Sequence, residues 1–352
     1  MATQVCNMIA VPLNPLRFTA LASKPLFISG LPQGSIIDWG DGTPQETTGF
    51  GQQINKTYGS SAAEFHATIM PPSASDPTGL ILKGDALKSV EEWGDFNHEG
   101  IKFGSSNNGG DGSPNLIAVP NSLPSSVYTT GEMFASATSF NQDISMWDMS
   151  NVSNTSAMFH QARNFNQPLN TWDVSAVTNM WEMFTEANAF NQPLDNWNVS
   201  AVTDMSYMFF NARVFDQDIG MWDVANVAQM SFMFSGARAF NQNIGGWNTS
   251  NVFTMDNMFN GAWAFNQDIG NWDVSNVQQM SNMFGNASAF NQDISRWNTA
   301  NVFSMSMMFY YAQAFNQDLS SWCVTNIPNQ PSLFDSAAFA WTLPRPVWGT
   351  CP

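Results

Sequence analysis

Histidines are the side chains best suited to acid–base catalysis, and the chain has three of them: His66, His98 and His160. They lie in different regions, and none belongs to a recognisable Ser/His/Asp or Cys/His set. The sequence also has no phosphate-binding loop and no zinc-ligand spacing. We therefore expect a protein that is not an enzyme, with no cofactor and no metal. A β-helical polysaccharide lyase or hydrolase is the enzyme alternative, and it would need charged groups clustered in one groove.

Carboxylates are the next candidates for chemistry. One aspartate column could ligate calcium, and its members are Asp143, Asp218, Asp268, Asp293 and Asp318. Pro168, Pro193 and Asn243 interrupt this column, which argues against a calcium site. Asp38 and Asp41 could form a carboxylate pair, but a tight Asp-Gly hairpin explains both of them better.

Cysteines offer one further bond. Cys323 directly follows the last of a series of regularly spaced tryptophans, and Cys351 lies one residue from the end of the sequence. We expect a disulfide between them that holds the tail across the last repeat in an oxidising environment, with two buried thiols as the alternative. Cys6 is left over.

The strongest signal in the sequence is a repeat, and its fold must position most of the candidate residues. Eight tryptophans stand 25 residues apart: Trp147, Trp172, Trp197, Trp222, Trp247, Trp272, Trp297 and Trp322. Two phenylalanine columns run in phase with them, from Phe140 to Phe315 and from Phe134 to Phe309, and a methionine precedes each member of the second. Such columns indicate a solenoid.

The repeat unit is Phe-Asn-Gln-Asp-Ile-Ser-x-Trp-Asp-Val-Ser-Asn-Val-x-x-Met-x-x-Met-Phe-x-x-Ala-x-x, and we number its positions 1 to 25 from the first Phe. The Phe…Ile/Leu…Trp part predicts one short strand. The Val-x-x-Met-x-x-Met-Phe-x-x-Ala part has apolar residues every three or four positions and predicts a helical turn or short helix. We therefore predict a right-handed, leucine-rich-repeat-like solenoid. We expect the two methionine columns to fill its core and the Asn and Gln columns to form structural ladders.

Four regions are predicted. Residues 1–84 form a small all-β sandwich with an N-terminal arm, and residues 85–130 form an irregular cap of the solenoid. Residues 131–322 hold eight repeats, and residues 323–352, rich in proline, close the other end. Both ends of a solenoid need such covers, because open strand edges and apolar faces promote aggregation.

Charge excludes several partners. The chain has 11 Lys+Arg against 28 Asp+Glu and a net charge of −17, which argues against nucleic acid and against anionic lipid. Neither a transmembrane span nor a secretory signal is recognisable, so we expect no membrane insertion.

Two stretches resemble known families. The array is similar to the Mycoplasma-lipoprotein type surface-protein repeat, a relative of the BspA-like leucine-rich repeats, and residues 265–284 carry its motif almost intact. The Trp39-Gly-Asp-Gly-Thr stretch with the later Thr57-Tyr-Gly resembles a polycystic-kidney-disease (PKD) type β-sandwich. The resemblance implies surface location and adhesion, and it carries no catalytic residues. Because a signal sequence and a lipid-anchoring cysteine are not found, it favours a virion component over a bacterial surface anchor.

Ligand contact is expected at positions that vary between repeats. Large aromatic residues stand where other repeats carry small or polar ones, and they predict one or two apolar stripes that bind a sugar or a partner protein: Trp181, Tyr207, Phe210, Phe232, Phe253, Trp263, Phe303, Tyr310 and Tyr311.

Three hypotheses follow for the function. The first is a phage or viral attachment protein that binds a host-surface glycan or protein. The second is a virion decoration or scaffold protein that contacts other subunits, and the third is a bacterial cell-surface adhesin. The expected location is the virion surface or the extracellular space, and a homo-oligomer stays open.

Overall fold

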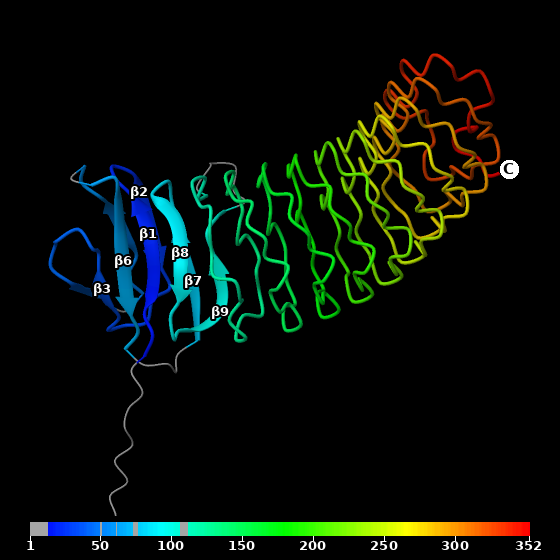
Figure 1. The fold of residues 1–352 in the computed structure, drawn as a ribbon. Helices are drawn as coiled ribbons and strands as arrows, with labels where there is room; N and C mark the ends of the chain where they lie inside the picture. The colour runs from blue at the N-terminus through cyan, green and yellow to red at the C-terminus, as the bar shows by residue number, and fades with distance from the viewer. Residues whose placement is uncertain (1–12, 50, 61, 73–76, 106–111) are drawn as a thin grey trace, which may run out of the picture.

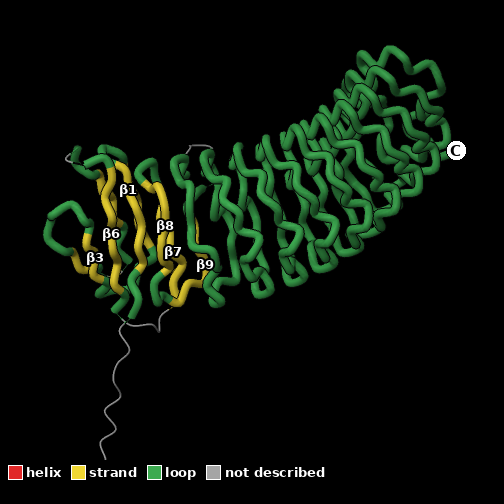
Figure 2. The backbone as a smooth tube through the Cα atoms, viewed as in Figure 1, coloured by secondary structure: helices red, strands yellow, loops and turns green. Residues whose placement is uncertain are grey.

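Two parts follow one another along the molecule, a two-sheet sandwich and a long stack of coils (Figure 1). The computed structural model describes residues 13–352 except 50, 61, 73–76 and 106–111. The predicted N-terminal arm, with Cys6, lies outside the described residues. Among the described residues, strands occur only in the sandwich and at its border with the stack (Figure 2).

Within the described part of this region, nine strands make up the sandwich: β1 (Leu16–Leu21), β2 (Pro25–Ser29), β3 (Ile36–Asp38), β4 (Glu46–Thr47), β5 (Ile54–Thr57), β6 (Glu64–Met70), β7 (Pro77–Lys83), β8 (Leu87–Trp93) and β9 (Asn97–Lys102). One sheet has the order β4-β3-β6-β1-β8 and the other the order β5-β2-β7-β9. Residues alternate between the two faces of a strand, so Phe65, Ala67 and Ile69 of β6 are buried between the sheets.

The sandwich continues directly into the stack. Strands β7 and β9 pair in parallel, and parallel bridges then join Gly100 of β9 to Thr129 and Ser89 of β8 to Ala118. From Thr129 a single bridge per repeat runs along the stack, through Asn154, Asn179, Asp204, Gln229, Thr254, Gln279 and Ser304. The last strand of each sheet therefore provides a template for the first coil.

The predicted helical segment is not helical, and the described residues contain no helix. In residues 155–161, alternate backbone N–H groups donate to carbonyl oxygens of the next coil, for example Ala157 to Trp181 and Phe159 to Met183. The N–H groups between them bond three residues back, which makes a chain of turns. Apolar residues three apart fit such turns as well as they fit a helix, so the periodicity alone was misleading.

The predicted strand is also misplaced. The Phe…Ile/Leu…Trp segment holds turns and no strand, whereas the bridge lies at position 15, inside the segment expected to be helical. The leucine-rich-repeat-like coil of one strand plus a helical turn is therefore wrong. Each coil is instead a closed series of turns, and hydrogen bonds to its neighbours replace a regular strand or helix of its own.

The core consists of the predicted columns. The tryptophans, phenylalanines and methionines of the repeat are buried, which confirms that these positions point inward. Equivalent rings stack from coil to coil, with centroids 5.5 Å apart for Phe159 and Phe184 and 6.5 Å apart for Trp172 and Trp197. Each indole N–H finds an acceptor in the preceding coil, as Trp172 Nε1 does at the Ile144 carbonyl, at 3.0 Å.

The amide columns form the predicted ladders. Asn266 Oδ1 accepts a hydrogen bond from the Asn291 backbone N–H and another from Gln292 Nε2, both at 2.9 Å. Asp216, the one aspartate in the asparagine column, accepts the same two bonds from Asn241 and Gln242. Position 2 of the repeat therefore requires a side-chain oxygen that accepts hydrogen bonds, and either asparagine or aspartate provides it.

Residues 323–352 cover the end of the stack. Trp341 packs edge-on against Phe309 and Phe315, with ring centroids 5.1 and 4.8 Å away, and so ends the stacked series. A disulfide joins Cys323 to Cys351, with Cα atoms 4.0 Å apart. The tail is thereby tied to the last coil.

Replacing Asn266 by alanine should destabilise the stack by about 1–3 kcal/mol, because the Asn291 N–H loses its acceptor and Gln292 Nε2 keeps only its bond to the Asn266 carbonyl. Asn266→Asp keeps both bonds and should cost less than about 1 kcal/mol, as Asp216 indicates. Urea unfolding of the full chain measures both variants. Equal losses for the two would contradict the acceptor argument.

Candidate functional site

Six of the nine predicted aromatic residues lie on one wall of the stack, which we call the ladder wall: residues 155–162 and their equivalents at positions 16–23. They are Trp181, Tyr207, Phe210, Phe232, Tyr310 and Tyr311. Trp263 follows at position 24, just past this wall. Phe253 and Phe303, at position 14, lie on the other side of the bridge column.

Three of the six form one aromatic cluster: Tyr207, Phe210 and Phe232. Tyr207 and Phe232 occupy the same position in adjacent coils and stack with centroids 4.4 Å apart and planes 7° from parallel. Phe210 meets both rings edge-on, at 5.6 Å from Tyr207 and 6.2 Å from Phe232. All three are half-buried, so the cluster is a fixed surface feature with accessible rings.

The backbone at this cluster is in an unusual conformation. Tyr207 and Phe232 have φ of 59° and 60°, in the left-handed region where bulky residues are disfavoured by about 1–2 kcal/mol. Asn257 and Asn282 occupy the same position in later coils, and asparagine is one of the few residues that tolerates it. Ala157, Glu182 and Met307 adopt the same conformation at this position, so the array imposes it on every side chain that stands there.

Carboxylates flank the aromatic cluster on both sides. Burial, followed by the charges of Glu182 and Asp256, raises the pKa of the Tyr207 hydroxyl. Burial also raises the pKa of Asp256, although the Ser281 N–H donates to it at 2.7 Å. Glu182 lies 3.1 Å from His160 Nδ1. The surface therefore combines apolar faces with hydrogen-bond acceptors. These two carboxylates were missed from the sequence because only aromatic residues were considered at the variable positions.

The remaining aromatics do not join this cluster. Trp263 lies under the Arg238 guanidinium, 4.1 Å from its ring centroid, and Tyr310 and Tyr311 contact each other at 4.6 Å. Phe253 and Phe303 are exposed, but Gln278 separates them in their column. Trp181 is half-buried and, among the described residues, stacks on none of the others. The aromatics therefore form separate groups along the array.

Histidines and aspartates are engaged in structural contacts. His66 Nδ1 lies 2.9 Å from the Thr19 hydroxyl, and buried His98 places Nε2 3.0 Å from the Trp93 carbonyl, while burial lowers its pKa. Each aspartate of the former calcium candidate column accepts the backbone N–H two residues later, as Asp143 does from Ser145 at 2.9 Å. Within the residues that the structure describes, no three His, Cys, Asp or Glu side chains gather as metal ligands.

The pair Asp38 and Asp41 belongs to the hairpin. Asp41 binds Lys56 at 2.9 Å, and this Lys56 ammonium lies over the ring of buried Trp39, 4.9 Å from its centroid. Burial alone would raise the pKa of Asp41, but hydrogen bonds from Lys56 and Thr43 outweigh it and lower the pKa to about 2. Asp41 is thus an anchor for the sandwich rather than part of a catalytic pair.

These features define a repeat protein of stacked coils with an aromatic surface site. Residues 121–219, 167–268 and 239–343 each match the family described as "Mycoplasma protein of unknown function, DUF285". The matches cover more than half of the chain, so it belongs to this family of Mycoplasma-type repeat proteins. No curated protein and no solved structure gives a match. No helix of the described part is long and apolar enough to cross a membrane.

The ion pair of Asp41 predicts a pH dependence of stability. Because its folded-state pKa is lowered, the carboxylate stabilises the fold above about pH 4, and this contribution is lost as the pH falls from about 4 to about 2. Calorimetry of the full chain should show Asp41→Asn less stable than the original at pH 7 and nearly equal to it near pH 2.

Lys56→Met provides the control, since it removes the same ion pair from the other side. In that background, Asp41→Asn should lose most of its effect at pH 7. A destabilisation that is the same at pH 7 and pH 2 would contradict the assignment.

Proposed function

We propose that the chain is a non-enzymatic recognition protein that binds a host-surface glycan or protein through the aromatic cluster of Tyr207, Phe210 and Phe232. The observation that carries this proposal is the stacking of the half-exposed Tyr207 and Phe232 rings on adjacent coils, with Phe210 edge-on to both. Aromatic faces pack on the apolar faces of sugars and on protein side chains, and Glu182 and Asp256 would accept hydrogen bonds at the edge of the cluster.

Display outside the cytoplasm is part of this proposal, on a virion or on a cell surface. The disulfide between Cys323 and Cys351 fits an oxidising location. A bacterial cell-surface adhesin and a phage or viral attachment protein are the two forms of this proposal. A kinship with BspA-like surface proteins and a PKD-like role of the sandwich as spacer belong to the same proposal.

A second candidate is a decoration or scaffold protein that contacts other virion subunits. It is favoured by the closing segment, where four large apolar side chains are exposed: Leu333, Phe339, Leu343 and Val347. Phe339 is 84% exposed, which is unusual for a phenylalanine on a surface with no partner. Phe339→Ser should then reduce incorporation into particles, whereas a change in the aromatic cluster should not.

The attachment hypothesis predicts that Phe232→Asn weakens binding to host cells at least tenfold. The variant should fold normally, because relief of about 1–2 kcal/mol of backbone strain offsets the loss of about 0.5–1.5 kcal/mol of ring stacking. Adsorption of labelled protein to host cells measures the binding, and thermal unfolding checks the fold.

Phe303→Gln is the matched control. It removes an exposed phenylalanine outside the cluster and introduces the residue that Gln278 provides at the same position one coil earlier. Binding by this variant should be unchanged. Full binding by Phe232→Asn, or an equal loss in both variants, would refute a specific site at the cluster.

A further inference from the structure

The ladder wall changes its chemistry in the two coils that follow the aromatic cluster. There, positions 18, 21 and 22 carry side-chain amides and glycine in place of rings: Asn257, Asn260, Gly261, Asn282, Gly285 and Asn286. In residues 255–262, 280–287 and 305–312, Asp256 is the only Asp, Glu, Lys, Arg or His. This part of the wall is therefore polar but nearly uncharged.

The four asparagines of these two coils, which we call the amide floor, hold one another in place. Asn257 Oδ1 accepts hydrogen bonds from Asn282 Nδ2 at 2.7 Å and from Asn260 Nδ2 at 3.4 Å. Asn260 Oδ1 accepts a third bond, from Asn286 Nδ2 at 3.2 Å. Among the described residues, Asn257 Nδ2 has no acceptor and Asn286 Oδ1 has no donor. The amide floor thus keeps both a donor and an acceptor available for a ligand.

Glycine keeps the amide floor low. Gly285 stands at position 21, which Phe210 and Tyr310 fill with rings in other coils. A Cβ atom on Gly285 would lie 1.9 Å from Asn282 Oδ1, so a side chain there would displace that amide. The floor therefore has no large side chain between the aromatic groups on either side of it.

Aromatic rings return at the far end of the amide floor. Tyr310 and Tyr311 contact each other edge-on, with ring centroids 4.6 Å apart and planes at 76°. Tyr311 is 43% exposed, and Met307 of the same coil is exposed as well. This pair lies three coils beyond Phe232, which is about 14 Å along the array at about 4.8 Å per coil. The wall thus carries two aromatic platforms with amides between them.

This combination of groups favours a neutral saccharide over other ligands. The apolar faces of sugar rings pack on aromatic side chains, and each sugar hydroxyl both donates and accepts hydrogen bonds, as an amide does. An apolar protein surface would bury the amides without partners, which is unfavourable. A charged ligand would find no opposite charge on the floor itself.

We propose that an uncharged oligosaccharide lies along the ladder wall from Phe232 to Tyr311. One sugar residue packs on the aromatic cluster and another on the tyrosine pair, while the hydroxyl groups between them bond to Asn257 Nδ2 and Asn286 Oδ1. This inference rests on the function proposed for the aromatic cluster. It names the ligand as a glycan rather than a protein, and it extends the site over three further coils.

Titration calorimetry on the full chain tests the proposal with three neutral hexasaccharides: cellohexaose, mannohexaose and N-acetylchitohexaose. At least one should bind, and about tenfold or more tightly than its own disaccharide, because only the longer chain reaches both platforms. Added salt should leave the affinity unchanged, since the ligand has no charge to screen. No binding by any of the three, or a disaccharide that binds as tightly, overturns the proposal.

Tyr311→Asn removes one platform and keeps the backbone, because Asn286 occupies the same position one coil earlier with nearly the same φ, 56° against 54°. This variant should bind the hexasaccharide about fivefold more weakly, and Phe232→Asn should do the same. Asn257→Ala removes the free amide donor at a position where Ala157 already stands, and it should weaken binding about threefold. Thermal unfolding checks each fold. Unchanged binding by Tyr311→Asn overturns the proposal.

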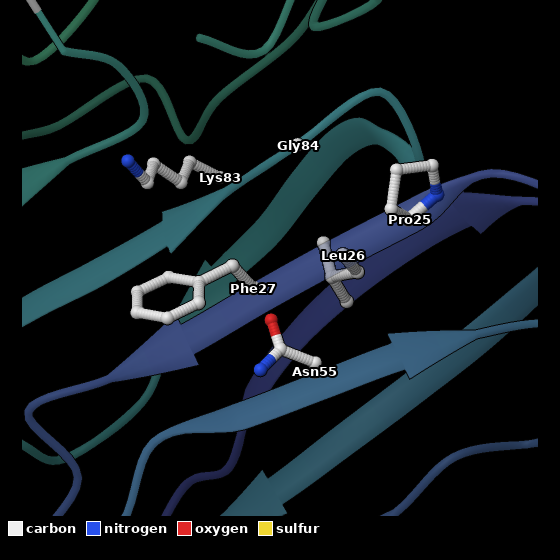
Figure 3. Close-up of a pocket in the computed structure, with 6 residues that line it drawn as sticks. All are labelled: Pro25, Leu26, Phe27, Asn55, Lys83 and Gly84. Carbon is white, nitrogen blue, oxygen red and sulfur yellow. The ribbon is translucent and has the colours of Figure 1, made fainter. Parts of the chain in front are cut away.

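Two aromatic residues outside the ladder wall provide controls. Phe303→Gln acts on the other side of the bridge column. Phe27→Thr removes a ring that lies beside Asn55 in a hollow of about 310 Å³ on the second sandwich sheet (Figure 3). This hollow has no second aromatic ring among its lining residues, and Lys83 Nζ lies 5.6 Å from the Phe27 centroid. Both variants should bind the hexasaccharide normally, and a loss in Phe27→Thr equal to that in Tyr311→Asn would overturn the proposal.

Adsorption to host cells separates this inference from the proposed function. Mild periodate cleaves sugars between adjacent hydroxyl groups, so treatment of the cells should abolish adsorption of the original chain. If adsorption survives periodate and still depends on Phe232, the ligand is a protein: the proposed function stands and the oligosaccharide is wrong. If Phe232→Asn adsorbs as well as the original chain, the proposed function itself is refuted, and this inference with it.

Discussion

The hydrogen-bond register between neighbouring coils is the constraint on which the rest of the array depends. A coil contains neither a helix nor a strand longer than one bridge residue, so its own bonds are only those of turns. Alternate N–H groups of the ladder wall donate to the following coil. Elsewhere in the coil, an asparagine side-chain oxygen accepts a hydrogen bond from the following coil, and the indole N–H donates one to the preceding coil. An insertion of one residue would shift every inward column at once. The strict spacing of 25 residues is therefore a requirement of the backbone as well as of the core.

The inward columns could be predicted because the same apolar side chains recur in almost every coil. Trp, Phe and Met recur at fixed positions, and the structure buries them. The backbone could not be predicted in the same way. Turns with a left-handed residue at positions 18 and 22 place apolar residues three and four apart, as a helix does. Glycine would have indicated this conformation, but Glu182, Tyr207 and Phe232 stand at position 18, and only Gly236 and Gly261 provide the signal at position 22.

The sequence indicated which aromatic residues belong to the candidate site, but not which of them contact one another. Tyr207 and Phe232 meet because the same position in adjacent coils is adjacent in space, and Phe210 joins them from three residues away. Phe253 and Phe303 share a position but are two coils apart, so they do not touch.

The regular hydrogen bonds between coils hold the strained backbone of the aromatic cluster in place. A left-handed tyrosine or phenylalanine costs about 1–2 kcal/mol, which would favour a different local conformation in an isolated turn. In the array, the N–H groups of Tyr207 and Phe232 donate to Ser231 and Asp256, and the coils on both sides hold the turn in place. The conformation is thus set by the neighbours, whatever side chain the position carries. Positions 17, 18, 21 and 22 can therefore change without loss of the fold, and a ligand surface can vary on a constant scaffold.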